Sequence, residues 1–375
     1  MSIPNIVAAP LSSIPSEIIC ARDYERTAEA FISPDCFAYL SGGSGHEVTL
    51  QNNRKAFANL AITPRIFKDV SNAHTQVKIL GCSLKHPILL APVAYQALVH
   101  QNGEMATACA AAATDTCLVS STLSSTALEA VASAAGDERW FQLYFQSRDE
   151  DTSALVERAV GAGYRALVVT VDAALQAPSI RAIRAGFQFP EQLVPANLVD
   201  QRPVTPPVIE TADQRHIFLS YMQNAPSREK LKRLVDESPV PVLVKGVLHA
   251  DDARELKALG VAGIIVSNHG GRTLDGAPAS LSVLPAIRQA VGDDYPLLLD
   301  SGIRSGDDVF KAIALGANAV LIGRLQVYAL SVAGPLGVAH MIKLLREELA
   351  LCMAMAGCAS IADIRATQLV SNVEW

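Results

Sequence analysis

The sequence predicts an α/β protein built as a (β/α)8 TIM barrel, and two observations carry this prediction. From residue 88 onward, short apolar segments alternate with helical stretches, a pattern typical of a parallel sheet whose outer face is covered by helices. The second observation is an internal repeat: at 163, 260 and 316 a glycine, two variable residues and a small residue precede three aliphatic residues. Repeated units of this kind favour a closed barrel over an open sheet.

The eight strands are predicted from apolar runs that end in polar or small residues. In chain order they are ILLAPVA (88–94), CLVSST (117–122), RWFQLYF (139–145), ALVVTVD (166–172), PVLVKGV (241–247), GIIVSN (263–268), PLLLDSG (296–302) and AVLIGR (319–324). An open doubly wound sheet would more often carry a glycine-rich fingerprint after its first strand. The segment LAPVAYQ has no such fingerprint, which also favours the barrel.

Two stretches lie outside the repeat. Residues 1–87 are predicted to form a helical cap packed on the barrel of residues 88–375, with helical patterns around Tyr24–Phe31 and Leu50–Leu60 and a hairpin in VKILGCSLKHP. The stretch 173–228, after the fourth strand, is rich in proline and polar residues. A loop of that length in a compact domain is usually a lid, a binding segment or disordered.

Composition narrows the functional classes. The net charge of −6 and the absence of a basic cluster argue against nucleic acid as a partner. The first residues lack a basic start and an unbroken apolar core, and we find no apolar run of about 18 residues, so we expect neither a signal peptide nor a membrane span. Seven scattered cysteines without a C-x-x-C pair indicate reduced thiols and a cytoplasmic location. We expect no metal site.

Polar side chains gather where the predicted strands end, and barrel active sites are built at these carboxyl ends. In strand order they and their neighbours are Pro92, Val93, Ala94, Ser120, Ser121, Thr122, Gln142, Tyr144, Thr170, Asp172, Lys245, Ser267, His269, Arg272, Asp300, Ser301, Gly302, Arg304, Gly323 and Arg324. Any one of them is more often structural, but Asp, Lys, His and Arg at four strand ends together indicate an active site. The glycines and arginines after the last two strands indicate a phosphate site.

The segment SNHGGRTLDG (267–276) resembles the active-site signature of the FMN-dependent α-hydroxy acid oxidase and dehydrogenase family, which includes glycolate oxidase, lactate oxidase and mandelate dehydrogenase. The likeness covers nearly the whole chain, from YLSGGSGHEVTLQNNRKAF in the cap to LDSGIRSGDDVFKAIALGANAVLIGR at the last strands. APVAYQALVHQNGE and TLSSTALE are most similar to the hydroxymandelate oxidase branch. The resemblance implies FMN, oxidation of an L-2-hydroxy acid to the 2-keto acid, and a homo-tetramer or octamer.

The resemblance also implies a role for each residue. His269 would be the base, held by Asp172, and it would remove either the hydroxyl proton with hydride transfer or the carbon proton first. Arg272 would grip the substrate carboxylate, Tyr39 and Tyr144 would offer hydroxyls, and the substrate would lie above Gly270 and Gly271. Lys245 would lie near N1 of the flavin. The remaining cofactor contacts would come from Pro92, Val93, Ala94, Ser121, Gln142, Thr170, Ser267, Asp300, Ser301, Gly302, Arg304, Gly323 and Arg324.

One loop departs from the family pattern. Where relatives show VD-x-P-x-x-G-R-R, this chain has VDAALQAPS, with Ser179 in place of the second arginine, which normally helps bind the substrate. Arg181 or Arg184 could substitute for it. The apolar loop predicts a bulky or aromatic substrate, and Ala94 favours oxygen over another electron acceptor. The alternatives are a flavoprotein with changed chemistry, acting on a hydroxy compound without a free carboxylate, or a degenerate flavin-binding barrel.

Overall fold

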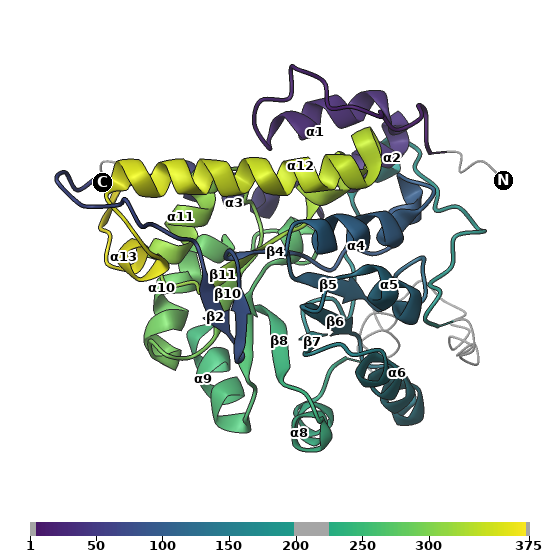
Figure 1. Ribbon diagram of the computed structural model, residues 1–375. Helices are drawn as coiled ribbons and strands as arrows, with labels where there is room; N and C mark the ends of the chain where they lie inside the picture. Colours follow the sequence, from purple (N-terminus) through teal and green to yellow (C-terminus); the bar gives the residue numbers. More distant parts are fainter. Residues whose placement is uncertain (1–4, 199–224, 373–375) are drawn as a thin grey trace.

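The computed structural model describes residues 5–198 and 225–372 and contains a closed barrel of eight parallel strands (Figure 1). The strands are β4 (Ile88–Leu90), β5 (Leu118–Ser121), β6 (Arg139–Leu143), β7 (Leu167–Thr170), β8 (Val242–Val247), β9 (Gly263–Val266), β10 (Leu297–Leu299) and β11 (Ala319–Ile322). They follow one another around the barrel in chain order, and β11 closes it by pairing with β4. The predicted TIM barrel is therefore confirmed.

Alternation along the strands separates the barrel interior from the layer under the helices. The interior cluster takes every second residue, for example Leu89 and Ala91 near β4, and Ala166 and Val168 near β7. The intervening residues, such as Ile88 and Leu90, face the outer core. Because both faces are buried, most residues of each strand are apolar, and polar ones such as Ser121 and Gln142 come toward the carboxyl end. The sequence therefore shows apolar runs that end in polar residues.

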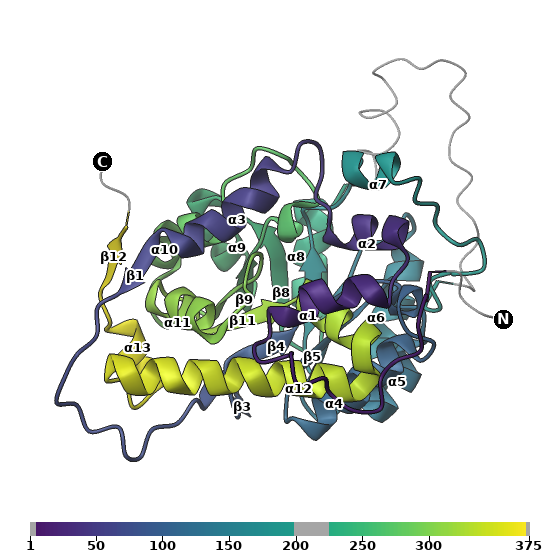
Figure 2. The same ribbon diagram turned by 90° about the horizontal axis from the view of Figure 1, so that it is seen from above.

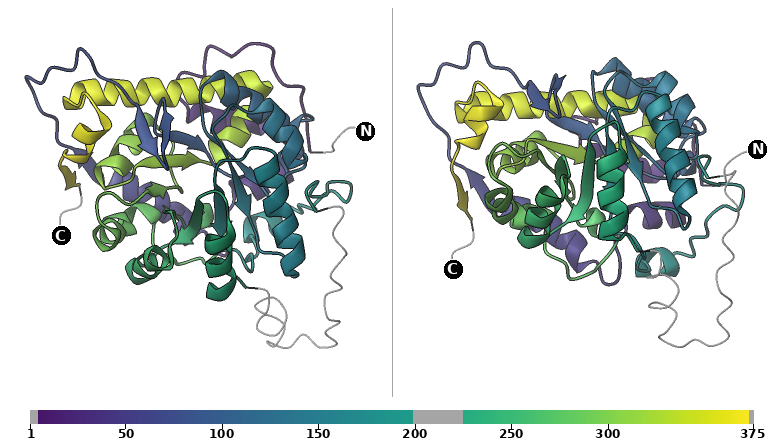
Figure 3. Two further views of the ribbon diagram at one scale, coloured as in Figure 1. Left: turned by 60° about the horizontal axis from the view of Figure 1, so that its bottom comes forward. Right: turned by 90° about the horizontal axis from the view of Figure 1, so that it is seen from below.

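Helices cover the outside of the barrel (Figure 3). They are α4 (Gly103–Ala113), α5 (Leu128–Ala134), α6 (Asp149–Gly161), α8 (Arg228–Glu237), α9 (Ala250–Leu259), α10 (Ser280–Val291), α11 (Gly306–Ala314) and α12 (Arg324–Ala356). The longest, α12, is apolar enough over 18 residues to meet the composition expected of a membrane span, but 78% of that window is buried inside the protein. It packs on α4 and α11, as a core helix does.

The N-terminal segment packs on the barrel at both ends. Its helices are α1 (Asp23–Thr27), η1 (Ala28–Ala30), α2 (Pro34–Ser41) and α3 (Val48–Ala58). Helix α1 lies along α12, while α3 packs on α10 and on the turn η5 (His269–Gly271). The hairpin of β2 (Val77–Ile79) and β3 (Cys82–Leu84) places Ile79 and Leu84 in the interior cluster of the barrel.

Contacts between distant segments complete the fold. Strand β12 (Leu369–Ser371) follows α13 (Ile361–Arg365) and pairs with β1 (Leu60–Ile62). On the other side of the molecule, α7 (Ile180–Arg184) lies against α2 (Figure 2). This contact joins the segment after β7 to the cap. Residues 199–224 of that stretch lie outside the described residues, so its interpretation as a lid, a binding segment or a disordered loop stays a prediction.

Candidate active site

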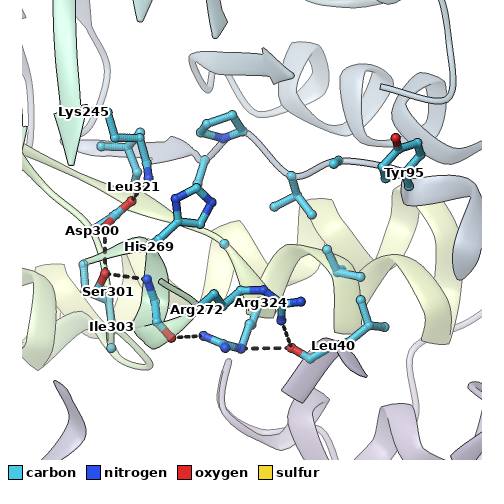
Figure 4. A pocket seen from close by; sticks show the side chains of 18 of the residues that line it. Leu40, Tyr95, Lys245, His269, Arg272, Asp300, Ser301, Ile303, Leu321 and Arg324 are labelled. Atoms are coloured by element: carbon cyan, nitrogen blue, oxygen red, sulfur yellow. Dashed lines mark hydrogen bonds and ion pairs between the residues drawn. The ribbon is translucent and has the colours of Figure 1, made fainter. Parts of the chain in front are cut away.

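A cavity opens at the carboxyl ends of the strands (Figure 4). Its walls include the predicted residues Tyr39, Pro92, Val93, Ala94, Tyr144, Lys245, His269, Arg272, Asp300, Ser301, Gly302, Arg304, Gly323 and Arg324. A smaller pocket adjoins it and is lined by Leu123, Tyr144, Ala173, Gln176, His269, Arg272 and Thr273. We call this smaller space the side pocket. His269 and Arg272, both predicted from the sequence, line both spaces.

The imidazole of His269 is held by a buried carboxylate. Its Nδ1 lies 2.9 Å from Oδ1 of Asp172, and the side chains are 27% and 10% exposed. Burial opposes ionisation of Asp172, but the charge of Lys245 and the hydrogen bond from His269 outweigh it and hold the pKa of this carboxyl below its usual value. An ionised Asp172 accepts the Nδ1 proton, so Nε2 is left as the nitrogen that can accept another.

Lys245 lies at the centre of a polar network that joins three strand ends. Its Nζ donates to Ser267 Oγ at 3.0 Å and lies 3.2 Å from Asp300 Oδ2. Burial disfavours the charge, but Asp300 and Asp172 more than compensate, so the pKa of Lys245 is raised. Ser301 Oγ continues the network by donating to Asp300 and accepting from the backbone N–H of Gly270. The ammonium is therefore kept charged beside the cavity.

Arg272 is oriented by the cap. Its Nη1 donates to the carbonyls of Tyr39 at 2.9 Å and of Leu40 and Gly42 at 3.3 Å. The guanidinium carbon also lies 4.7 Å from the centre of the Tyr39 ring, a cation–π contact. These hydrogen bonds all use Nη1. The other nitrogens of the guanidinium remain to bind an anion in the cavity.

Tyr144 also lines the cavity and directly follows β6. Burial raises the pKa of its hydroxyl to about 12, although Lys245 acts in the other direction. The phenol therefore stays protonated at neutral pH and can donate a hydrogen bond. Tyr39, from the cap, also lines the cavity. The two tyrosines and Arg272 thus reach the same space from three parts of the chain.

Packing inside the protein requires glycine at both positions after His269. A Cβ on Gly271 would lie 2.7 Å from the backbone nitrogen of Leu50, and one on Gly270 would lie 2.6 Å from Nη1 of Arg324. Both glycines also have left-handed backbone conformations that other residues seldom adopt. The glycines therefore admit helix α3 and an arginine, and the expected place of the substrate above them stays a prediction.

Two further arginines line the cavity next to the last two strands. Arg304 pairs with Glu25 of the cap at 3.0 Å. Arg324 donates to the carbonyls of Leu40, Gly42 and Gly270, and burial together with Arg272 lowers its pKa to about 10. It stays charged at neutral pH. The structure thus brings together the cations that the sequence predicts as a phosphate site.

The remaining predicted cofactor residues are buried next to residues that line the cavity. Ser121 donates to Gln142 Oε1 at 3.2 Å, and Ser267 accepts from Lys245. Gln142 Nε2 and Thr170 Oγ1 are buried without a hydrogen-bond partner. Unpaired buried polar atoms are costly, so these two groups fit a ring of donors and acceptors such as an isoalloxazine. The residues present therefore fit a flavin.

The loop after β7 does not deliver the predicted substrate residues. Ser179 Oγ accepts from the backbone N–H of Ala182 and caps α7. Arg181 pairs with Glu47 and donates to Ser41 at 3.4 Å, so its guanidinium is bound by the cap. Neither Ser179 nor Arg181 lines the cavity or the side pocket, so their assignment to substrate binding is corrected.

The cavity also has walls that the sequence patterns do not single out. They include Leu40, Tyr95, Gln176, Ile303, Val327 and Tyr328. Leu40 and Tyr95 are neighbours of predicted residues, so extending those segments by one position would have found them. Gln176 lies in the loop whose sequence departs from the family pattern, and that departure could have marked it as a residue to consider for the site. Val327 and Tyr328 lie within α12 and carry no sequence signal.

Comparisons with known proteins agree with this site. A family model described as FMN-dependent dehydrogenase matches residues 28–371. An L-lactate oxidase of Alicycliphilus denitrificans is 54% identical over 95% of this chain and 97% of that protein. A 4-hydroxymandelate oxidase of Amycolatopsis orientalis is 40% identical over 92% and 97% of the two chains. A solved structure of mandelate oxidase with benzoyl-formic acid has a TM-score of 0.86 and 38% identity, covering 95% of this chain and 99% of that one.

The fold and the site together define a flavin-dependent oxidoreductase of the TIM-barrel class. The base, the buried lysine and the arginines lie where the strands end, and the unpaired buried groups suit a flavin ring. The chain belongs to the FMN-dependent dehydrogenase family, and its cofactor is FMN. The resemblance seen in the sequence motifs is thereby confirmed.

Proposed function

We propose that this protein oxidises an L-2-hydroxy acid to the corresponding 2-keto acid. The observation that carries the proposal is the His269–Asp172 pair, 2.9 Å apart, on the wall that also holds Arg272. A base next to a fixed cation suits a substrate that carries a hydroxyl beside a carboxylate. FMN, when bound, supplies the two-electron acceptor that the oxidation needs.

Each of the other side chains at the cavity has its own role in the reaction. Asp172 holds Nδ1 of His269, so Nε2 takes a proton from the substrate, and the carboxylate then stabilises the imidazolium. Arg272 binds the substrate carboxylate with the part of its fork that faces the cavity. Tyr144, kept protonated by burial, donates to a substrate oxygen, and Tyr39 offers a second hydroxyl from the cap. Lys245 supplies positive charge beside the flavin.

The cofactor is held from the ends of several strands. Pro92, Val93 and Ala94 line the cavity, while Ser121, Gln142, Thr170 and Ser267 are buried next to residues that line it. Arg304, Gly323 and Arg324, with Asp300, Ser301 and Gly302, suit the phosphate and its ribityl chain.

We also propose that the substrate carries a bulky apolar or aromatic side chain. The side pocket has Leu123 and Ala173 among its walls, and no arginine stands at position 179 to hold a small acid by its charge alone. Apolar burial would replace the missing clamp at about 25 cal/mol per Å². The relatives include L-lactate oxidases as well as a 4-hydroxymandelate oxidase, so lactate is the reference substrate for this proposal.

Three further properties complete the proposal. Oxygen is the electron acceptor, as the names of the oxidase relatives suggest. The protein is cytoplasmic, which suits its seven free cysteines. It forms a homo-tetramer or octamer, by analogy with the family. A degenerate flavoprotein is not favoured, because the base, its carboxylate and the carboxylate-binding arginine remain assembled at one cavity.

The test begins with the visible spectrum of the purified protein and the mass of the cofactor that acid releases. Anaerobic bleaching is then followed with glycolate, L-lactate, (S)-mandelate and a longer aliphatic 2-hydroxy acid, and air is admitted to detect peroxide. We expect FMN, bleaching by the larger acids and rapid reoxidation. Bound FMN that no 2-hydroxy acid bleaches would overturn the proposed activity. If lactate or glycolate bound and reacted best, only the bulky-substrate proposal would fall.

A further inference from the structure

We infer that Gln176 supplies the second contact to the substrate carboxylate, and that it sets how strongly the site discriminates between a 2-hydroxy acid and its neutral amide. The inference rests on the proposed function and deepens it. It begins from the loop after β7, where this chain has no arginine at position 179. A substitute for that clamp has to come from side chains that reach the substrate.

The three polar alternatives in the same loop face elsewhere. Ser179 is used as the N-terminal cap of α7, and its Oγ lies so near Gly42 that a Cβ there would be 2.8 Å away. Arg181 is bound by Glu47 and Ser41 of the cap. Arg184 is exposed in the last turn of α7 and lines neither space. The guanidinium groups that could have replaced the missing one are thus directed away from the substrate.

Gln176 is the exception. Of the polar side chains in 173–184, all of them within the described chain, it alone lines both the main cavity and the side pocket. In both spaces its companions are Tyr144, His269 and Arg272. A primary amide offers two N–H donors and one acceptor, so it can bind a carboxylate oxygen without bringing a charge.

The side chains around the substrate carboxylate determine how the site distinguishes an acid from its amide. Among the side-pocket walls that the described residues form, Arg272 is the one fixed cation. A neutral donor makes a weaker bond to an anion than a charged one. The carboxylate is therefore held by one charged and one neutral partner. A neutral amide of the same hydroxy compound loses less binding here than it would between two arginines, and position 176 controls the difference.

The experiment compares an acid with its amide in variants of the holoenzyme. Dissociation constants are measured from the anaerobic flavin spectrum with L-lactate and L-lactamide, and with (S)-mandelate and its primary amide. Gln176→Glu should weaken acid binding about tenfold or more and amide binding about threefold or less, because a carboxylate at 176 repels the substrate carboxylate and competes for Arg272. Gln176→Arg should tighten acid binding by roughly tenfold, since charged bonds are stronger.

A matched control excludes a general charge effect. Arg184→Gln changes the net charge of the loop by the same unit as Gln176→Glu but lies off the cavity, and it should leave the ratio of acid to amide affinity unchanged. FMN content checks that each variant is folded. Equal effects of Gln176→Glu on acid and amide, or the same shift in the control, would overturn the inference. Failure of the parent to react with any 2-hydroxy acid would instead count against the proposed function.

Discussion

The imidazole Nδ1 of His269 lies 2.9 Å from Oδ1 of Asp172, a contact between residues 97 positions apart in the chain. Asp172 follows β7 and His269 follows β9, and β8 lies between these strands in the barrel. The parallel pairing of β7, β8 and β9, with their carboxyl ends on one side, therefore brings a base and its carboxylate together although no local element connects them. The pair leaves Nε2 for the substrate, and it leads to the first prediction.

Replacing the base should stop the chemistry and spare the cofactor. In His269→Gln we expect FMN content like that of the parent and a rate of anaerobic flavin reduction lower by about 10²–10⁴-fold. Asp172→Asn should show a smaller loss, because it acts through the imidazole. Stopped-flow absorbance with saturating substrate measures both rates. A His269→Gln variant that reduces its flavin at the parent rate would assign the imidazole a structural role.

At acidic pH the folded protein should lose the stability that the ionised Asp172 contributes. Its pKa in the folded protein lies below the ordinary value, which is about 3.9, so its contribution to stability is present above that value and is lost as pH falls through the lower folded pKa. The parent should be more stable than Asp172→Asn at pH 7, and the gap should narrow below about pH 4. Thermal unfolding of both proteins across this range checks the trend. A gap that stayed constant would show that the charge contributes nothing.

The charge of Lys245 should be visible in the redox potential. The ammonium is buried and pairs with Asp300 at 3.2 Å, so it adds positive charge where a reduced flavin gathers negative charge. Lys245→Met should lower the midpoint potential of the bound FMN by roughly tens of millivolts. Lys245→Arg, which keeps the charge, should restore much of it. Equal potentials in the parent and Lys245→Met would place the lysine away from the flavin.

The ring of Phe187 should help to position Tyr39. The two rings stack with centres 4.3 Å apart and planes inclined by 10°, while Tyr39 also contacts Arg272. Such a pair contributes about 0.5–1.5 kcal/mol, so Phe187→Ala should raise KM by roughly 2- to 10-fold with a smaller change in kcat. Phe187→Tyr, which keeps the stack, serves as the control. A large loss of kcat at unchanged KM would contradict a positioning role.

An arginine at position 179 should change selectivity at some cost in stability. Ser179 caps α7 through its Oγ, and loss of such a cap costs about 0.5–2 kcal/mol. Ser179→Arg should shift selectivity toward small acids such as glycolate and L-lactate, because a charged bond to the carboxylate contributes about 1.5–3 kcal/mol. Steady-state kinetics across the substrate panel measure this shift, with Ser179→Ala as the control for the cap. If the parent already bound the small acids tightly, the reasoning about the missing arginine would be wrong.

The sequence by itself determined the barrel and most of the site. Strands buried on both faces are mostly apolar, so β4 to β11 could be found from composition. Polar residues in or just after the carboxyl-terminal part of such strands necessarily meet at one end of a parallel barrel. For this reason the amino-acid sequence alone is enough to select His269, Lys245 and Arg272. The motifs in the same segments also indicate the family and the cofactor.

Only the tertiary structure decided what depends on contacts between distant segments. Gly271 is required by Leu50 of the cap, and the course of Arg181 is set by Glu47, 134 positions earlier. Neither contact leaves a periodic pattern in the sequence, because the partners are far apart in the chain and come together only when it folds. The same holds for Gln176: its position in the loop could be read from the sequence, but its place on the cavity wall beside Tyr144, His269 and Arg272 exists only in the folded chain.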